Sequence, residues 1–139
     1  MTSNQRTVEL TWTGSGMRFT GRGTDPESPA VTIDGDGQAG PSPMQALLLA
    51  AAGCSGADVV HVLGKMRVSL TALSVEVTGT RAEQDPKRYA AINFRYRMEG
   101  DGLDREKAER AVGLSLEKYC SVVHSLAGDI DVSHEIELA

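Results

Sequence analysis

The stretch "SPMQALLLAAAGCSGADVVHVLGKMR", residues 42–67, predicts one long helix around which the rest of the chain must fold. Ser42 and Gln45 form a Ser-x-x-Gln capping box at its start, and Pro43 suits the first helical position. We expect the helix to run to about Arg67. Because its middle is apolar on almost every side, we expect another helix or a partner chain to bury it on most sides.

Alternating apolar and polar residues on both sides of this helix predict strands. Three short candidates precede it, within residues 7–14, 17–23 and 28–37. Two more follow, within residues 71–84 and 89–100, and a loop "EQDPKR" joins them as a hairpin. In the second of these, one set of alternate positions is apolar: Ile92, Phe94, Tyr96 and Met98.

The rest of the chain predicts a second helical region and a last strand. Residues 103–120 form an amphipathic helix capped by Asp104, residues 121–128 continue or restart it, and residues 129–138 alternate again. The order is βββ-α-ββ-α-α-β. We therefore predict an α+β fold in which helices cover one face of antiparallel strands.

Composition limits the domain count and the partners. With 139 residues, the chain is expected to be a single domain spanning 1–139. A net charge of -5 and only 4% aromatic residues argue against nucleic acid and anionic membranes as partners. The apolar run 46–57 is too short to span a bilayer, and the N-terminus has no secretory pattern. We expect a cytoplasmic protein.

The two cysteines, Cys54 and Cys120, allow two interpretations. Each alone fits a small, inert core thiol, but together they fit a transient redox pair if the two helices pack against each other. Gly53 and Gly56 each cost the long helix roughly 0.5–1 kcal/mol relative to alanine, which tight packing or access to the thiol would offset. The chain has neither a CxxC nor an HxxxH motif, so we expect no metal.

Helical spacing places Cys54, Asp58, His61 and Lys65 on one stripe. A protonated His61 or Lys65 would lower the pKa of the Cys54 thiol. Asp58 would raise that pKa directly, but it would also favour protonated His61. Asp58 and His61 are therefore candidates for tuning the thiol.

Two segments resemble the OsmC/Ohr superfamily, and within it the YhfA-like branch: "GPSPMQALLLAAAGCSGADVVHVLGKMR" (40–67) and "EKYCSVVHSLAG" (117–128). The resemblance implies an OsmC-like domain that forms an intertwined homodimer, with two long central helices buried between subunits. It also implies an oxidative-stress peroxidase without a cofactor. Cys54 would reduce an organic hydroperoxide and become a sulfenic acid, Cys120 would condense with it to a disulfide, and an external dithiol would reopen the disulfide.

The chain departs from the hydroperoxide-reducing branches at two positions. Those branches begin the helix with Asn-Pro-Glu and carry an activating arginine in a Gly-Gly-Arg turn. Here the helix begins Ser-Pro-Met, with Met44 in place of the glutamate and Gln45 one position later. The matching turn lacks the arginine, so Arg18 and Arg22 nearby are the candidates for its role.

These departures leave a second function open. The chain would then be a non-catalytic OsmC-like dimer that binds a small apolar ligand in an interface pocket. Met44, Leu47 and Leu48 would line that pocket. The sequence therefore does not decide whether the protein is an enzyme.

Overall fold

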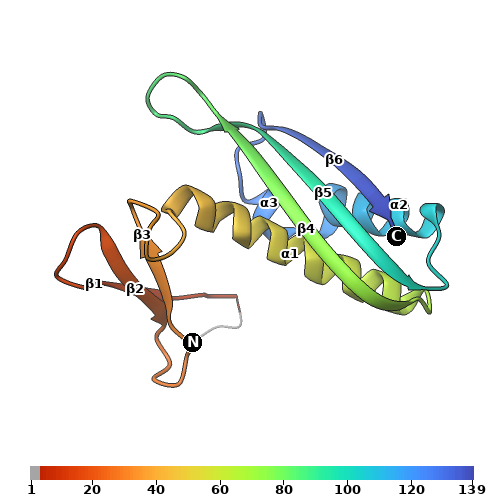
Figure 1. Ribbon diagram of the computed structural model, residues 1–139, viewed down its shortest axis with the longest axis horizontal. Helices are drawn as coiled ribbons and strands as arrows, with labels where there is room; N and C mark the ends of the chain where they lie inside the picture. The colour runs from red at the N-terminus through yellow and green to blue at the C-terminus, as the bar shows by residue number, and fades with distance from the viewer. Residues whose placement is uncertain (1–3) are drawn as a thin grey trace. The chain divides into compact units, whose positions relative to one another are not determined.

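The computed structural model describes residues 4–139 and has the element order that the sequence predicts (Figure 1). The α+β class is confirmed. In chain order the elements are β1 (Val8–Trp12), β2 (Arg18–Gly23), β3 (Val31–Asp34), α1 (Pro43–Lys65), β4 (Ser69–Arg81), β5 (Tyr89–Asp101), α2 (Arg105–Leu114), the π-helical segment η1 (Ser115–Tyr119), α3 (Ser121–His124) and β6 (Asp131–Leu138).

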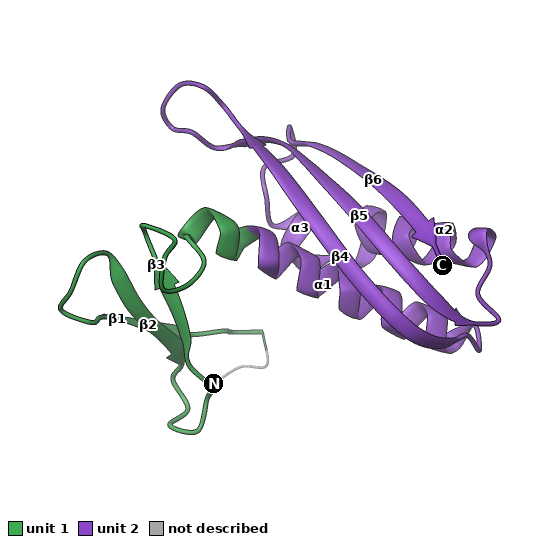
Figure 2. Cartoon of the chain, viewed as in Figure 1, with its two compact units in different colours: residues 1–47 green, residues 48–139 purple. Residues whose placement is uncertain are grey.

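The chain divides into two compact units, residues 1–47 and 48–139 (Figure 2). Helix α1 begins in the first unit and continues into the second. The assignment of 1–139 to one domain stays a prediction, and its first three residues lie outside the described residues.

The first unit is an antiparallel meander in the order β1-β2-β3. The loop after β3 is organised by Asp34, whose buried carboxylate accepts hydrogen bonds from the backbone N–H groups of Asp36, Gln38 and Ala39. At the start of α1 the predicted capping box is confirmed. Ser42 N–H donates to Gln45 Oε1 over 3.0 Å, and Gln45 N–H donates to Ser42 Oγ over 3.2 Å.

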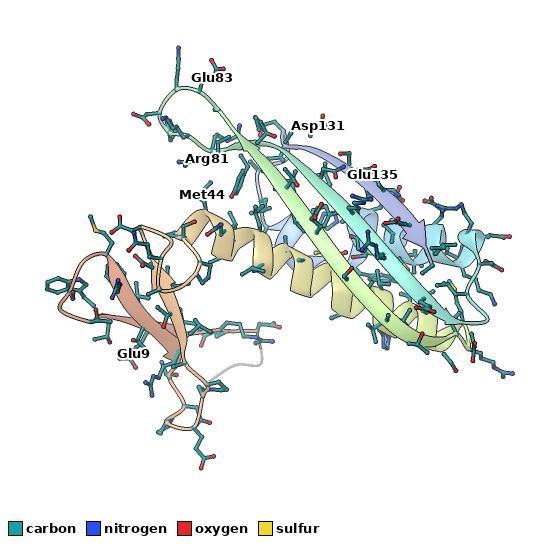
Figure 3. The ribbon with its side chains drawn as sticks, in the orientation of Figure 1. Glu9, Met44, Arg81, Glu83, Asp131 and Glu135 are labelled. Atoms are coloured by element: carbon teal, nitrogen blue, oxygen red, sulfur yellow. The ribbon has the colours of Figure 1, made fainter. Side chains whose placement is uncertain are left out.

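The second unit is built on a sheet in the order β4-β5-β6. Strands β4 and β5 form a long antiparallel hairpin, with Arg81 and Glu83 near its tip (Figure 3). The predicted apolar face of β5 is confirmed, since its four residues are at most 1% exposed: Ile92, Phe94, Tyr96 and Met98. The prediction of antiparallel strands is wrong for β6, which runs parallel to β5. Helices α2 and α3 supply the crossover that a parallel connection requires.

Within a single chain, α1 is buried along one stripe only: Ala51, Ser55, Val59 and Leu63. Gly56 lies on this side, where Leu73 and Val75 of β4 pack close to it. On the other side Leu49 and Val60 are 62% and 52% exposed. The expected burial on most sides is therefore not met by the described residues of one chain.

Helix α1 has 23 residues and is apolar enough to cross a membrane by length and composition, so the run 46–57 underestimates its apolar length. Its stripe of buried residues, spaced four apart, is the pattern of a helix that packs on a protein core. We therefore interpret α1 as a core helix of a folded unit.

The predicted helix over residues 103–120 is wrong at its C-terminal end. Helix α2 ends at Leu114, and η1 follows with wider turns. The backbone N–H of Cys120 donates to Ser115 O over 2.7 Å, and Cys120 is extended, with φ -69° and ψ 101°. Helix α3 then restarts at Ser121. The second of the two predicted long helices is thus two helices joined by a π-helical turn.

Candidate redox site

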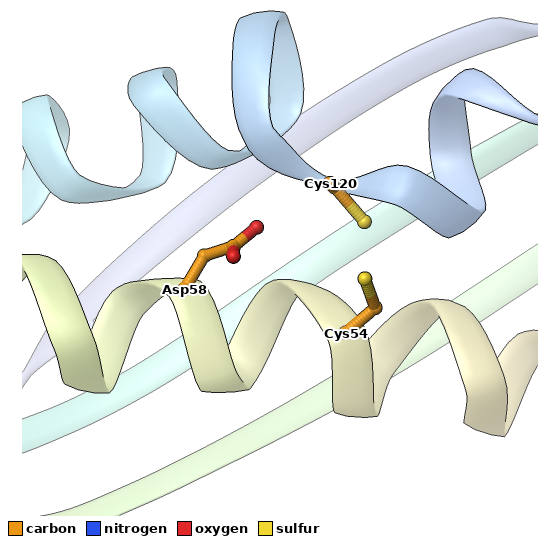
Figure 4. A group of neighbouring side chains, drawn as sticks. All are labelled: Cys54, Asp58 and Cys120. Carbon is orange, nitrogen blue, oxygen red and sulfur yellow. The ribbon is translucent and has the colours of Figure 1, made fainter. Parts of the chain in front are cut away.

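The second unit brings together Cys54 of α1, Asp58 one turn later, and Cys120 at the junction of η1 and α3 (Figure 4). The two sulfur atoms and a carboxylate oxygen of Asp58 all lie within 4.8 Å of one another. Both cysteines are free thiols. Cys54 is partly exposed, whereas Cys120 is fully buried. Figure 4 shows the two thiols pointing toward each other.

Local backbone structure fixes the position of the Cys120 thiol. The Cys120 N–H donates to Ser115 O at the end of η1. The Cys120 carbonyl accepts a hydrogen bond from the His124 N–H over 3.0 Å at the start of α3. Both backbone polar groups of Cys120 are therefore held. A π-helical turn is uncommon in proteins and is frequent at functional sites.

A chain of buried hydroxyl groups supports the Asp58 carboxylate. Ser115 Oγ donates to Asp58 Oδ2 over 3.0 Å. Because a serine hydroxyl has a single proton, Ser55 Oγ must be the donor in its 2.8 Å contact with Ser115 Oγ. By the same reasoning, Tyr96 OH donates to Ser55 Oγ over 2.6 Å. All three hydroxyl donors therefore point toward Asp58.

Burial determines the protonation states around the site. Burial, the neighbouring Cys54 thiol and the Asp58 charge together raise the pKa of Cys120 to about 11, against a lowering by the Val123 backbone hydrogen bond. Burial also raises the pKa of Tyr96 to about 12. Both groups therefore keep their protons at neutral pH. Tyr96 can act as the first donor of the hydroxyl chain.

A pocket of about 510 Å³ adjoins Asp58. Its other lining residues are basic or largely apolar: His61, Lys65, Arg110, Val62, Met66, Leu114 and Tyr119. Three basic side chains in one pocket are notable in a chain of net charge -5. Asp58 thus joins the thiol pair to a partly apolar, partly cationic space that neither cysteine lines.

The predicted site residues fall into two groups, one in each compact unit. The structure brings Cys54, Cys120 and Asp58 together and puts His61 in the adjoining pocket. Gln45 serves the helix cap. Arg18 pairs with Asp34 over 3.7 Å, and Arg22 is exposed on β2. Gln45, Arg18 and Arg22 belong to the first unit, so their roles toward the thiols stay predictions.

Sequence reasoning missed the hydroxyl chain of Ser55, Tyr96 and Ser115. A signal for Ser55 was present, because it is the polar member of the buried stripe on α1. A buried polar side chain needs a hydrogen-bonding partner, which could have pointed to a network. Ser115 gave no such signal, since its partners come from a helix far away in the sequence.

The fold and the paired thiols define a class of protein that comparison with known families identifies. A family model described as OsmC-like protein matches residues 35–135, and the chain belongs to this family. The predicted OsmC/Ohr membership is confirmed.

Particular relatives agree with this assignment. Protein YhfA of Escherichia coli strain K12 is 38% identical over 109 residues, covering 78% of this chain and 81% of YhfA. The crystal structure of a hypothetical protein from Aquifex aeolicus VF5 matches with TM-score 0.82 and 30% identity, over 98% of each chain. OhrB of Bacillus subtilis, an organic hydroperoxide resistance protein, matches with TM-score 0.61 and 21% identity, over 97% of this chain and 98% of OhrB. At that identity the likeness to OhrB shows the fold alone.

Proposed function

We propose that the protein reduces organic hydroperoxides in the cytoplasm with Cys54 and Cys120 as a redox pair. The observation that carries the proposal is the proximity of the two thiols, which share a cluster whose ligand atoms lie within 4.8 Å. In the first step the Cys54 thiolate attacks the hydroperoxide, the O–O bond breaks, an alcohol leaves and Cys54 becomes a sulfenic acid. Cys120 then attacks the Cys54 sulfur and releases water, and an external dithiol reduces the resulting disulfide.

Exposure supports this division of roles. Cys54 is the more accessible thiol, as an attacking group must be. Cys120 is fully buried and its pKa is raised to about 11, so it is poorly suited to attack a substrate from solution. It has only to reach the neighbouring sulfur. No metal or organic cofactor enters these steps.

The test is a thiol count on reduced protein before and after one equivalent of cumene hydroperoxide. We expect two thiols to fall to none, with an intramolecular disulfide detected by mass. Cys54→Ser should abolish peroxide consumption, while Cys120→Ser should spare the first turnover and leave a sulfenic acid. Normal turnover by Cys54→Ser would reject the mechanism.

Arg18 and Arg22 remain our candidates for activating the thiol, with Gln45, Asp58 and His61 as further supporting residues. If one arginine has this role, its replacement by alanine should slow the first turnover at least about tenfold, whereas the other replacement should not. Equal rates for both variants and the parent protein would exclude both arginines.

We propose that the working form is a homodimer in which α1 contacts a second copy of the chain. The exposed side of α1 carries a stripe of small and apolar residues: Leu49, Gly53, Ala57, Val60 and Gly64. A Cβ added at Gly53 would meet nothing within 4 Å in the described chain, so its packing partner is not in that chain. Small residues let two helices approach closely, which would offset the cost of a helical glycine.

Sedimentation of a matched pair of variants tests the homodimer. Gly53→Arg should shift the protein to monomers, whereas Gly113→Arg should not, although its Cβ also meets nothing within 4 Å. A parent protein that sediments as a monomer at micromolar concentration would contradict the proposal.

The second candidate function is ligand binding without turnover. The pocket beside Asp58 favours it, because apolar walls and three basic side chains fit a ligand with an apolar body and an anionic group. Anilinonaphthalene sulfonate is a suitable probe. Its fluorescence should rise on binding to the parent protein and to Cys54→Ser, and should fall with Arg110→Ala. If thiols also persist in the peroxide experiment, this candidate becomes the better one.

A further inference from the structure

We propose that reduced Cys54, reduced Cys120 and Asp58 form a binding site for one soft divalent cation, with Zn²⁺ and Cd²⁺ as its representatives. The site needs only the reduced thiols and the carboxylate. It therefore goes beyond peroxide reduction and does not depend on it.

The distances among the donor atoms carry the inference. A tetrahedral zinc site with Zn–S bonds of about 2.3 Å places its ligand atoms roughly 3.5–3.8 Å apart. In the structure the two sulfurs and the carboxylate oxygen already lie within 4.8 Å of one another. Closing the remaining distance, about 1.3 Å at most, needs only side-chain movements of that size.

The donor set selects the kind of cation. Two thiolates prefer soft or borderline metals to Mg²⁺ or Ca²⁺, and a carboxylate is an ordinary third ligand for zinc. Binding replaces the two thiol protons, which leave to solvent, and water can fill the fourth position. The complex of M²⁺ with two thiolates and one carboxylate carries a single net negative charge. The basic residues His61, Lys65 and Arg110 line the pocket that Asp58 adjoins.

A supporting contact is already in place. Carboxylates that bind metals are usually held by hydrogen bonds to groups behind them. Here Ser115 Oγ donates to Asp58 Oδ2 over 3.0 Å, and Ser55 and Tyr96 support Ser115 in turn. The Asp58 carboxylate is thus oriented by the protein, and its remaining lone pairs can bind a cation.

Sequence spacing hid this site. The usual zinc motifs leave two to four residues between paired cysteines, whereas Cys54 lies in α1 and Cys120 at the junction of η1 and α3. Their proximity depends on the π-helical turn that places Cys120 beside α1. The expectation of no metal rested on spacing alone.

The experiment titrates Cd²⁺ into the full chain, kept reduced by a phosphine, and follows the ultraviolet charge-transfer band of cadmium thiolates. We expect one equivalent per chain, with competition by Zn²⁺. Cys54→Ser and Cys120→Ser should each lose most of the band, and Asp58→Asn should weaken binding at least about tenfold. The matched control is Asp131→Asn, an exposed carboxylate at the start of β6 (Figure 3), which should bind as the parent does.

A second measurement needs no variant and guards against misfolding. Cd²⁺ at one equivalent should protect Cys54 of the parent protein from alkylation, as read by mass spectrometry. An absent band at micromolar Cd²⁺, a band unaffected by Cys120→Ser, or half an equivalent per chain would overturn the site. Failure of peroxide turnover would not, because binding is measured without peroxide.

Discussion

Ser115 donates a hydrogen bond from its Oγ to Asp58 Oδ2 over 3.0 Å, and this contact joins the π-helical segment η1 to α1 beside the two thiols. It is the link through which the buried hydroxyl chain reaches the site. The buried hydroxyl groups of Ser55, Tyr96 and Ser115 beside the cysteines thus all have hydrogen-bond partners.

Ser115→Ala should destabilise the protein by about 1–3 kcal/mol, because it leaves Ser55 without its buried acceptor and Asp58 without a donor. Urea unfolding of reduced protein measures the loss. The control is Ser74→Ala on the exposed side of β4, which should change stability by less than about 0.5 kcal/mol. Equal free energies of unfolding for the two variants would mean that the hydroxyl chain contributes nothing to stability.

The two cysteines should differ in reactivity by at least about tenfold toward iodoacetamide at pH 8. Because the pKa of Cys120 is raised to about 11, its thiolate fraction at that pH is on the order of one in a thousand. Cys120 labelling should rise with pH and become fast once denaturant exposes the thiol. Peptide mass spectrometry reads both sites. Faster labelling of Cys120 than of Cys54 in native protein would contradict the assigned burial.

Asp34→Asn should remove a pH dependence of stability from the first unit. Hydrogen bonds from the backbone N–H groups of Ala39 and Asp36 hold the pKa of Asp34 below its ordinary 3.8, against desolvation by burial. With the folded pKa below the unfolded one, the carboxylate stabilises the fold above about pH 3.8. This contribution is lost as the pH falls through the lower, folded pKa.

Unfolding at pH 7, 5 and 3 follows this loss. The parent protein should be clearly more stable than Asp34→Asn at pH 7. The difference between their free energies of unfolding should become smaller toward pH 3. Asp36→Asn, at an exposed position of the same loop, is the control. A difference in unfolding free energy that stays constant from pH 7 to pH 3 would show that the charge of Asp34 does not cause the difference in stability.

Gly79→Ala should destabilise the second unit by about 1–3 kcal/mol. The ring of Tyr89 lies over Gly79 on the β4–β5 hairpin, and a methyl group at position 79 would overlap it. Tyr89 would have to leave its buried position, so its pKa, which burial raises, should fall toward 10.0. Absorbance titration of tyrosine measures the pKa. Gly128→Ala, where a Cβ meets nothing within 4 Å, should leave both quantities unchanged.

Features set by neighbouring residues could be predicted from the sequence. The capping box of Ser42 and Gln45 and the buried alternation from Ile92 to Met98 follow from local spacing, and the structure has both. Family resemblance added the expectation that Cys54 and Cys120 act as a redox pair; the structure brings the two thiols close together, and their roles stay predictions. Each of these inferences needed either a short window or a known motif.

Features set by distant segments escaped prediction. The parallel direction of β6 depends on where the α2–α3 crossover returns the chain. The helix is interrupted at Cys120 because the Cys120 N–H bonds to Ser115 O in a wider, π-helical turn. An amphipathic sequence pattern does not reveal such a turn. The contact of Ser55 with Tyr96 joins a helix to a strand that the sequence gives no reason to align.

The direction of the hydroxyl chain has a consequence for how protons leave the site. Its far end, Tyr96, is fully buried, and burial raises its pKa to about 12, so the chain ends in the core at a hydroxyl that keeps its proton at neutral pH. A proton released when either thiol reacts cannot leave the site through this hydroxyl chain. Two other routes remain: directly to solvent from the partly exposed Cys54, and through the side of Asp58 that adjoins the pocket lined also by His61. The buried hydroxyl chain therefore orients Asp58, and the exposed side of the site exchanges protons with water.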